Sequence, residues 1–209
     1  MKIIISTHNK DKLEELLAAS KGLNNKINFS TLEDFPNIGD IEETGKTLQE
    51  NALIKARAVY SITELPTLSD DTGLEVDALH GAPGVYTARY AGKNCSYMDN
   101  VNKLLEDMLK VPIPNRTAQF KTVIAYVDNN VELIAEGRAK GFISRAATGE
   151  NGFGYDPIFF IPEAKKTFAE MKIKEKEIYS HRGKAIRQMF SLLKEHFDKL
   201  NKQSAKEMA

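Results

Sequence analysis

Short runs of apolar residues alternate along the chain with longer stretches in which apolar residues recur at helical spacing. The β-branched run at Lys2–Ser6 predicts a buried strand. Leucines recurring through Lys10–Ser20 predict an amphipathic helix. A second strand is expected at Ile27–Ser30 and a longer helix at Thr47–Ile62. This alternation of strands and helices is typical of an α/β protein.

The remaining patterns predict further strands and two more helices. A helix over Ser96–Leu109 has Ser96 as its N-cap and an apolar face that includes Met98. The last helix is expected at Gly183–Leu200. Strands and connections are expected at Pro66–Ser69, at Thr117–Val127 and Val131–Ala139 joined by a turn at Asp128–Asn130, and at Pro157–Ile161, with loops at Gly81–Gly84 and Arg145–Gly154.

No linker, repeat or low-complexity segment divides the 209 residues. We therefore expect a single domain over residues 1–200, followed by a polar, frayed tail over residues 201–209. The preferred arrangement is one continuous sheet with helices around it, shaped into two lobes with a cleft between them.

The composition narrows the possible functions. Lys and Arg together number 29, as do Asp and Glu, and this balance argues against a general nucleic-acid or membrane-surface binder. Cys95 is the one cysteine, so no intramolecular disulfide can form, and we interpret it as structural. No signal peptide is recognisable, and no apolar run approaches the roughly 20 residues of a membrane span. We expect a cytoplasmic protein with no membrane or nucleic-acid partner.

A first polar cluster, Ser6 to Lys12, lies between the first predicted strand and its helix. Backbone N–H groups at a helix N-terminus attract anions, and Lys12 adds a positive charge. A triphosphate suits such a pocket. The alternative is ordinary capping of the helix by Asn9, with Lys12 in solvent.

A second cluster comprises Glu42-Glu43-Thr44-Gly45, followed by Asn51 and Lys55 on the next predicted helix. Adjacent carboxylates can hold a hard cation such as Mg²⁺. They can also simply favour the helix dipole. Asn51 and Lys55 share the helix face opposite the apolar stripe, so a solvated polar face is the alternative interpretation.

A third cluster, Ser69-Asp70-Asp71-Thr72-Gly73, directly follows a predicted buried strand. Adjacent acids repel each other unless a cation or a proton lies between them, so a metal site or a raised pKa is a reasonable hypothesis. One carboxylate can then orient or deprotonate water. The alternative is a turn in which the Asp side chains bond their own backbone.

A fourth cluster is Gly152-Phe153-Gly154-Tyr155-Asp156-Pro157. Glycine permits close approach of the backbone to a ligand, Phe153 can stack on a base, and Asp156 can accept hydrogen bonds from base nitrogens. The alternative is a glycine-rich turn with a core phenylalanine.

The fifth cluster combines Lys176, a candidate phosphate ligand, with Ser180-His181-Arg182-Gly183 before the last helix. His181 and Arg182 are donors that can read a carbonyl oxygen, although such residues at a helix start are usually structural. Walker A loops, zinc-type Cys/His spacing and G-x-S-x-G elbows are absent from the sequence. The combination of paired acids, lysines and an aromatic glycine loop is what favours a nucleotide site.

These motifs, taken in order, resemble the inosine triphosphate pyrophosphatase family, also called Ham1-like. The resemblance runs from Lys2 to about Leu200. It is carried by Thr7-x-Asn9-x-x-Lys12, Glu42-Glu43-Thr44-Gly45 with Glu50-Asn51-Ala52 and Lys55-Ala56, Ser69-Asp70-Asp71-Thr72-Gly73-Leu74, Gly81-Ala82-Pro83-Gly84-Val85-Tyr86 with Ala88-Arg89-Tyr90, Gly152 to Pro157, and Ser180 to Gly183.

The resemblance implies an elongated α/β fold with a mixed central sheet, a central cleft and a homodimer. It implies hydrolysis of ITP, dITP or XTP to the monophosphate and pyrophosphate with Mg²⁺, which prevents incorporation of these nucleotides into DNA and RNA. Asp71 matches the general base, and Glu42 and Asp71 match the metal ligands. The residues that match substrate contacts are Thr7, His8, Asn9, Lys10, Asp11, Lys12, Lys55, Thr72, Phe153, Gly154, Tyr155, Asp156, Lys176, His181 and Arg182.

Two points remain open within this resemblance. Many members have glycine where this chain has His8, so affinity for phosphate is expected to differ if the side chain narrows the pocket. Glu43 and Asp70 lie beside the matched acids, so the metal roles can shift by one residue. His181 and Arg182, which match the donors to a purine 6-oxo group, would disfavour adenine.

Three rival functions give different expectations. A Maf-like pyrophosphatase acting on pyrimidine or modified nucleotides has a related fold, but the motifs at Phe153–Asp156 and Ser180–Arg182 argue against it. A nucleotide sensor without catalysis would not need Glu42, Asp70 and Asp71. A nucleic-acid binder would show steep salt dependence, which the zero net charge disfavours.

Overall fold

A computed structural model describes residues 2–21 and 27–207. Its centre is an eight-stranded mixed sheet with the order β2-β1-β3-β5-β6-β7-β8, in which β4 also pairs with β3. The parallel pairs are β1 with β2 and β1 with β3. The strands are β1 Lys2–Ile5, β2 Asn28–Thr31, β3 Thr67–Val76, β4 Pro83–Gly84, β5 Thr117–Val127, β6 Glu132–Ile143, β7 Phe159–Ile161 and β8 Lys166–Thr167.

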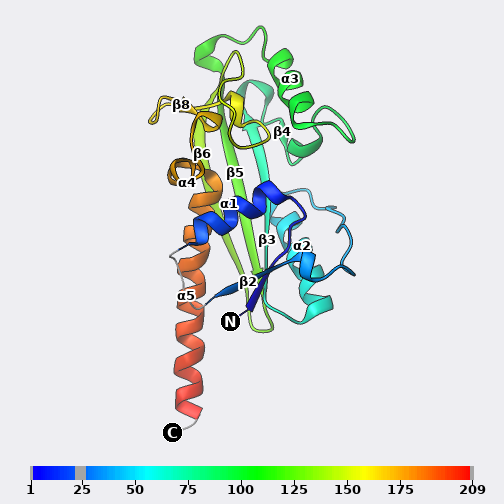
Figure 1. Cartoon of the computed structure of the whole chain (residues 1–209), viewed down its shortest axis with the longest axis vertical. Coiled ribbons are helices and arrows are strands. Elements are labelled where there is room, and N and C mark those ends of the chain that lie inside the picture. Colours follow the sequence, from blue (N-terminus) through cyan, green and yellow to red (C-terminus); the bar gives the residue numbers. More distant parts are fainter. Residues whose placement is uncertain (1, 22–26, 208–209) are drawn as a thin grey trace.

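Within the described residues, five α-helices surround this sheet, and the molecule is elongated (Figure 1). The long β5–β6 hairpin runs along the molecule, with α5 on one side and α2 on the other, while α3 and the short strands β4 and β8 lie toward one end. The helices are α1 Lys10–Ser20, α2 Leu48–Thr63, α3 Tyr97–Asp107, α4 Ile173–Tyr179 and α5 His181–Glu207. The predicted class, an elongated mixed sheet flanked by helices, is confirmed.

Strand β5 shows how the sequence builds the two faces of the sheet. Val123 and Ala125 pack into the cluster that contains the apolar stripe of α2. Ile124 and Tyr126 pack into the cluster that contains α5. Side chains along a strand alternate between faces, so an uninterrupted apolar run indicates a strand covered on both sides. A third cluster fills the other end of the molecule around Phe120, Phe168 and the residues of α3 and β7.

The largest departure from the sequence prediction is in β3. A short strand was expected at Pro66–Ser69, with a turn at Asp70 and Asp71 as one of two interpretations, but β3 continues to Val76 and pairs with β5 along its whole length. The turn interpretation is wrong because the backbone of these aspartates is held by β5. Asp disfavours strands, yet here each carboxylate has a cation nearby, so tertiary contacts override propensity.

Several smaller predictions are also corrected. Helix α4 was not expected, and α5 begins at His181 and continues to Glu207 rather than covering Gly183–Leu200. Residues 156–158 form a 3-10 helix, so β7 begins only at Phe159. Met98, expected to face inward, is exposed because it lies beyond the buried stripe of α3. Residues 208 and 209 of the expected frayed tail lie outside the described residues.

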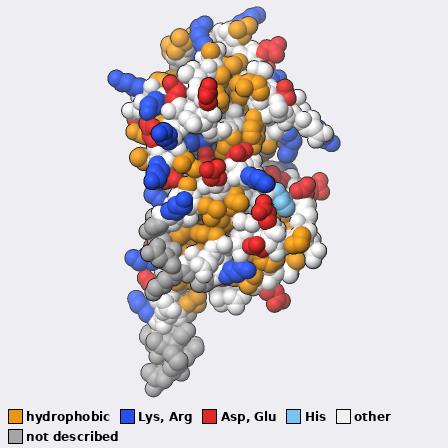
Figure 2. Space-filling model, viewed as in Figure 1, with side chains coloured by type: hydrophobic (Ala, Val, Ile, Leu, Met, Phe, Trp, Pro, Cys, Tyr) orange, Lys and Arg blue, Asp and Glu red, His pale blue; other side chains and the backbone are white. Residues whose placement is uncertain are grey.

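The surface carries both signs of charge. Figure 2 shows Lys and Arg interspersed with Asp and Glu over the face in view, with hydrophobic side chains between them. Among the residues that the structure describes, no helix combines the length and apolar character needed to cross a membrane.

Candidate active site

A cavity of about 350 Å³ lies where one edge of β3 is left uncovered. On the side of β3 away from β5, β1 pairs only with Thr67 and Leu68, and β4 pairs only with Leu74 and Glu75. Side chains from both faces of β3 therefore reach the same open space around this edge. The end of β1, the start of α1 and the segment after β4 supply further walls.

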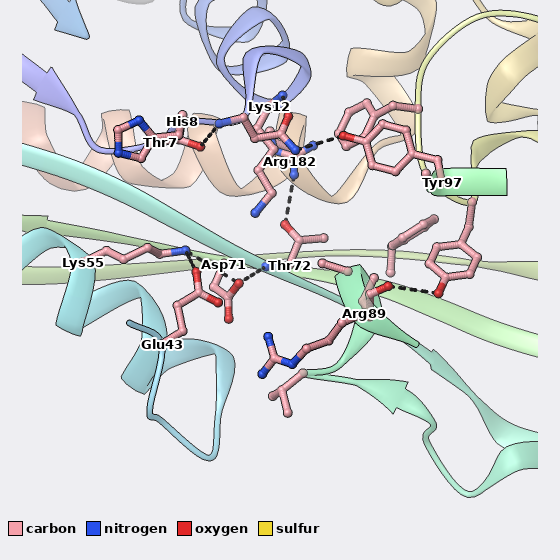
Figure 3. Close-up of a pocket in the computed structure, with 18 of the residues that line it drawn as sticks. Thr7, His8, Lys12, Glu43, Lys55, Asp71, Thr72, Arg89, Tyr97 and Arg182 are labelled. Carbon is pink, nitrogen blue, oxygen red and sulfur yellow. Dashed lines mark hydrogen bonds and ion pairs between the residues drawn. The ribbon is translucent and has the colours of Figure 1, made fainter. Parts of the chain in front are cut away.

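The cavity brings together most of the candidate residues from all five sequence clusters (Figure 3). Three candidates do not line it: Lys10 is exposed and lies 3.9 Å from Glu33, Asp11 is half-buried and contacts the lining residue Tyr97, and Glu42 is exposed. The candidates that line it are Thr7, His8, Asn9, Lys12, Lys55, Asp71, Thr72, Phe153, Gly154, Tyr155, Asp156, Lys176, His181 and Arg182.

The loop before α1 combines capping with a buried cation. Asn9 Oδ1 accepts the N–H of Lys12 at 2.9 Å, so Asn9 is the N-cap of α1. Lys12 is nevertheless not in solvent, because its Nζ lies 3.5 Å from the buried Asp70 carboxylate. Burial lowers the pKa of Lys12, an effect that Asp70 opposes. Capping and cation placement therefore occur together, and the solvated-lysine alternative is wrong.

Asp71 faces α2. The polar side chains of Asn51 and Lys55 on this helix contact Asp71, so the interpretation of a solvated polar face is wrong. Asn51, buried on α2, donates to Asp71 Oδ2 at 3.2 Å, and Lys55 Nζ lies 3.8 Å from Asp71 Oδ1. Burial raises the pKa of Asp71, Lys55 opposes this rise, and Glu43 adds to it. A carboxylate with a raised pKa is a better proton acceptor.

Glu43 rather than Glu42 supplies the second carboxylate at this end. Its Oε1 lies 2.5 Å from Lys55 Nζ, whereas the neighbouring Glu42 is exposed and does not line the cavity. Asn51 Oδ1 accepts the N–H of Gly45 at 2.8 Å and so fixes the segment that carries Glu43. A Cβ at Gly45 would lie 2.6 Å from that oxygen, which is why a glycine fits there.

Asp70 points to the opposite face of β3, as alternation along a strand requires. Its Oδ2 lies 3.5 Å from Lys12 Nζ and accepts from Arg182 Nη2 at 3.2 Å. Burial alone would raise the pKa of Asp70, but Lys12, Arg182 and Lys55 together hold it well below its ordinary value. This carboxylate is therefore permanently ionised near neutral pH.

Glu15 on α1 joins two further cations in a buried network that sequence reasoning missed. One of its oxygens accepts from Lys176 and the other from Arg182. Burial would raise the pKa of Glu15, but Arg182 and Lys176 outweigh it and lower that pKa. The available signal was positional: Glu15 directly precedes Leu16 on the buried side of α1.

The other end of the cavity is aromatic. Half-buried Phe153 lines it, and the ammonium of Lys176 lies 5.2 Å from the centre of its ring. Asp156 accepts from Lys176 and from the N–H of Phe153 at 2.9 Å. Burial raises the pKa of Asp156, and Lys176 opposes this rise. Lys176, expected as a phosphate ligand, therefore belongs to the aromatic end, and Phe153 is a cavity wall rather than a core residue.

His181 is held as a neutral ring at this end. It stacks on Phe120 with ring centres 4.5 Å apart, and burial, followed by the charge of Arg182, lowers its pKa well below its ordinary value. Its Nδ1 is buried without a partner. Within the described residues, the other buried side-chain atoms without partners are Ser6 Oγ and Asp70 Oδ1. All three belong to the site, where unsatisfied polar groups indicate a ligand.

Tyr97 and Arg89 also line the cavity without having been assigned a role from the sequence. The Tyr97 hydroxyl accepts from Asn9 at 3.1 Å and donates to Asp11 at 3.0 Å, and its ring lies against Phe153 with centres 5.7 Å apart. Tyr97 thus ties α3 to the loop before α1. Its position after the capping residue Ser96 gives no sequence signal of this contact.

Fold and site together define a class of protein: an α/β protein whose cavity offers cations and carboxylates at one end and aromatic rings with buried donors at the other. Such a cavity suits a small anionic ligand that carries an aromatic group. The Ham1 family model matches residues 3–192, and the chain belongs to this family.

Relatives of known name cover nearly the whole chain. A dITP/XTP pyrophosphatase of Thermoanaerobacter pseudethanolicus is 46% identical over 186 residues, which is 89% of this chain and 93% of the relative. That of Geobacter sulfurreducens is 44% identical over 196 residues, covering 93% and 96%. The solved structure of a HAM1 protein from Coxiella burnetii superposes with a TM-score of 0.84 at 41% identity, covering 93% of this chain and 99% of that one.

Proposed function

We propose that this chain hydrolyses non-standard purine nucleoside triphosphates, namely dITP, ITP and XTP, to the monophosphate and pyrophosphate, and so keeps them out of DNA and RNA. Family membership and the dITP/XTP pyrophosphatase relatives support this function. The observation that carries it is the two-ended cavity. Lys12, Lys55 and Asp71 lie toward the charged end, and Phe153 and His181 lie toward the aromatic end.

We include Mg²⁺ in this proposal because the donor set fits it. Asp71 and Glu43 both line the cavity, and Lys55 contacts both of them. No group of three or more protein ligands occurs within the described residues. In nucleotide sites Mg²⁺ typically uses one or two carboxylates and takes its remaining ligands from phosphate and water. When bound, the ion would neutralise phosphate charge; Glu43 and Asp71 would hold it.

We assign the role of general base to Asp71. Its pKa is raised by burial, and Asn51 holds the carboxylate at 3.2 Å. In the proposed reaction Asp71 takes a proton from water as the water oxygen bonds to phosphorus and the linkage between the α- and β-phosphoryl groups breaks. Lys12 and Lys55 would offset part of the roughly four negative charges of the triphosphate.

Selection for a 6-oxo purine follows from the donors at the aromatic end. Arg182 has five N–H groups and uses four, two to Asp70, one to Glu15 and one to Thr72, so one Nη1–H remains for a ligand. That donor would meet a 6-oxo group favourably, whereas adenine presents a 6-amino donor there. An unmatched buried donor costs about 1–3 kcal/mol, or roughly 5- to 150-fold in kcat/KM.

The experiment is product analysis of purified protein with Mg²⁺ and ITP, XTP, GTP or ATP in separate reactions. We expect monophosphate and pyrophosphate from ITP and XTP, with little product from GTP or ATP. Binding without turnover would favour a nucleotide sensor, preferred cleavage of pyrimidine or modified nucleotides would favour a Maf-like enzyme, and release of single phosphates would refute the bond assignment. The family resemblance also leads us to propose a homodimer, which light scattering would test.

A further inference from the structure

Five lysine and arginine side chains line the cavity, and four of them already have carboxylate partners. Lys12 lies near Asp70, and Lys55 contacts Glu43 and Asp71. Lys176 and Arg182 each contact two carboxylates, with Glu15 shared between them. Each of these four cations therefore already has at least one carboxylate partner, which reduces the positive charge it presents to a ligand. The fifth lining cation is Arg89.

Arg89 differs from the other four in having no carboxylate within ion-pair distance among the described residues. Its guanidinium lies 5.2 Å from the centre of the Tyr86 ring. A cation over an exposed aromatic ring is held in position only weakly, and its charge remains uncompensated. Figure 3 shows the side chain extending from its ribbon into the cavity toward the end that contains Asp71 and Glu43.

The backbone that carries Arg89 is firmly anchored. Arg89 ends the 3-10 helix η3, Thr87–Arg89. Thr87 Oγ1 accepts the N–H of Leu74 at 2.8 Å, and the Thr87 carbonyl accepts from the Tyr155 hydroxyl at 3.0 Å. The carbonyl of Ala88 accepts from Asn100 at 3.2 Å. Arg89 is thus supported from β3, from α3 and from the aromatic end of the cavity, as a binding residue requires.

We propose that Arg89 binds the terminal phosphates of the nucleoside triphosphate, the portion released as pyrophosphate. This assignment rests on the proposed function. A guanidinium presents a planar fork of N–H donors that matches phosphate oxygens, and it stays protonated throughout. Because the other lining cations are balanced by carboxylates, Arg89 supplies the free positive charge that distinguishes a triphosphate from a monophosphate. The competing interpretation is a solvated surface arginine that merely rests on Tyr86.

The test compares Arg89→Gln and Arg89→Lys with a matched control, Arg145→Gln, which removes an exposed arginine outside the cavity. We measure KM for ITP and the inhibition constants for pyrophosphate and for inosine monophosphate. Loss of a charge-assisted hydrogen bond predicts that Arg89→Gln raises KM and the pyrophosphate constant by about 10- to 100-fold. The monophosphate constant stays unchanged, Arg89→Lys falls between, and the control matches the parent protein.

Two results would overturn the assignment: an unchanged pyrophosphate constant in Arg89→Gln, or an equal loss for pyrophosphate and monophosphate, which would indicate a general disturbance. The same titrations by calorimetry need no turnover. If the parent protein does not hydrolyse ITP, the proposed function fails, while pyrophosphate binding that is lost only in the Arg89 variants still supports a phosphate-binding Arg89. If Arg89→Gln hydrolyses ITP and is inhibited by pyrophosphate as strongly as the parent protein, the proposed function is retained but Arg89 does not bind the terminal phosphates.

Discussion

Asp70 and Asp71 are adjacent in β3, yet they face opposite sides of the sheet and opposite chemical surroundings. Asp70 lies among Lys12 and Arg182, which hold its pKa well below its ordinary value. Asp71 lies beside Asn51 and Lys55 on α2, and burial raises its pKa. The backbone is the same strand in both cases, so the difference comes from what packs on each face.

The comparison extends to the two walls of the cavity. On the α1 and α5 side, Glu15, Asp70 and Asp156 are matched by Lys12, Lys176 and Arg182, and this network holds the wall together. On the α2 side, the carboxylates of Glu43 and Asp71 share the single cation Lys55. The first wall is electrostatically complete and serves as scaffold. The second wall has one more carboxylate than it has cations, and we propose that the metal binds and the reaction occurs there.

The largest effect on stability is expected at the centre of the complete wall. Glu15→Gln leaves Lys176 and Arg182 without their shared carboxylate, and breaking such a buried pair costs about 3–5 kcal/mol. Because the pKa of Glu15 is lowered from 4.5, its contribution is fully present above pH 4.5 and is lost as pH falls through the lowered value.

The measurement is denaturant unfolding of Glu15→Gln and the parent protein at pH 7 and at several pH values below 4.5. The gap in unfolding free energy should shrink steadily toward acid. Glu14→Gln, the neighbouring substitution on a less buried side chain, serves as the matched control and should stay near the parent. A gap that does not change with pH would mean that charge pairing is not what Glu15 contributes.

A smaller effect, on the Mg²⁺ dependence of activity, tests the proposal that the metal binds at the α2 wall. Glu43→Gln removes one of the two carboxylates that contact Lys55 in the cavity, whereas Glu42→Gln changes an exposed side chain one residue away. We expect Glu43→Gln to raise the Mg²⁺ concentration for half-maximal activity by about 10- to 100-fold, comparable to effects of disturbing metal-site groups. Glu42→Gln should change it by less than about 2-fold. If Glu42→Gln instead had the larger effect, Glu42 would be the metal ligand, as the family resemblance implies.

The smallest effect is expected at His8, on the loop before α1. Its Nε2 lies 3.8 Å from a fully exposed Asp40 carboxylate at the rim of the cavity. Exposed pairs contribute little, so His8→Gly should change KM for ITP by less than about 5-fold. Steady-state kinetics decides this. If the substitution instead tightens KM by about an order of magnitude, the imidazole narrows the phosphate end.

Much of the fold was predictable because its signals are local. Asn9 before α1 and Thr47 before α2 are capping residues, and the uninterrupted apolar run of β5 marks a strand covered on both faces. The extent of β3 was not predictable in this way. Two adjacent aspartates normally end a strand, and only the cations brought by α1, α2 and α5 make Asp70 and Asp71 tolerable inside one.

The sequence motifs predicted which segments meet at the candidate site, but they did not predict several of the contacts that these residues make. Lys176 and Arg182 were expected to contact substrate, and both are also buried in ion pairs with Glu15. A sequence does not show that a glutamate on α1 lies against residues more than 160 positions later. For the same reason Arg182→Ala will disturb the scaffold as well as specificity, and Arg182→Lys, which retains the charge, is the better test of base selection.

The most direct test of the division between the two faces of β3 compares Asp70→Asn and Asp71→Asn for both turnover and unfolding. Asp71→Asn should lower kcat for ITP by at least about 1,000-fold, since it removes the proposed base and metal charge. It should leave the unfolding free energy equal to or above that of the parent, because a raised pKa means that ionising Asp71 lowers the stability of the fold as pH rises from the ordinary aspartate pKa through the raised one.

Asp70→Asn should instead lower the unfolding free energy by about 3–5 kcal/mol at neutral pH, because Lys12 and Arg182 lose their buried partner. Its stabilising contribution is expected to fade only as pH falls below the ordinary aspartate range. Near-normal kcat in Asp71→Asn, or equal losses of stability in the two variants, would contradict the account.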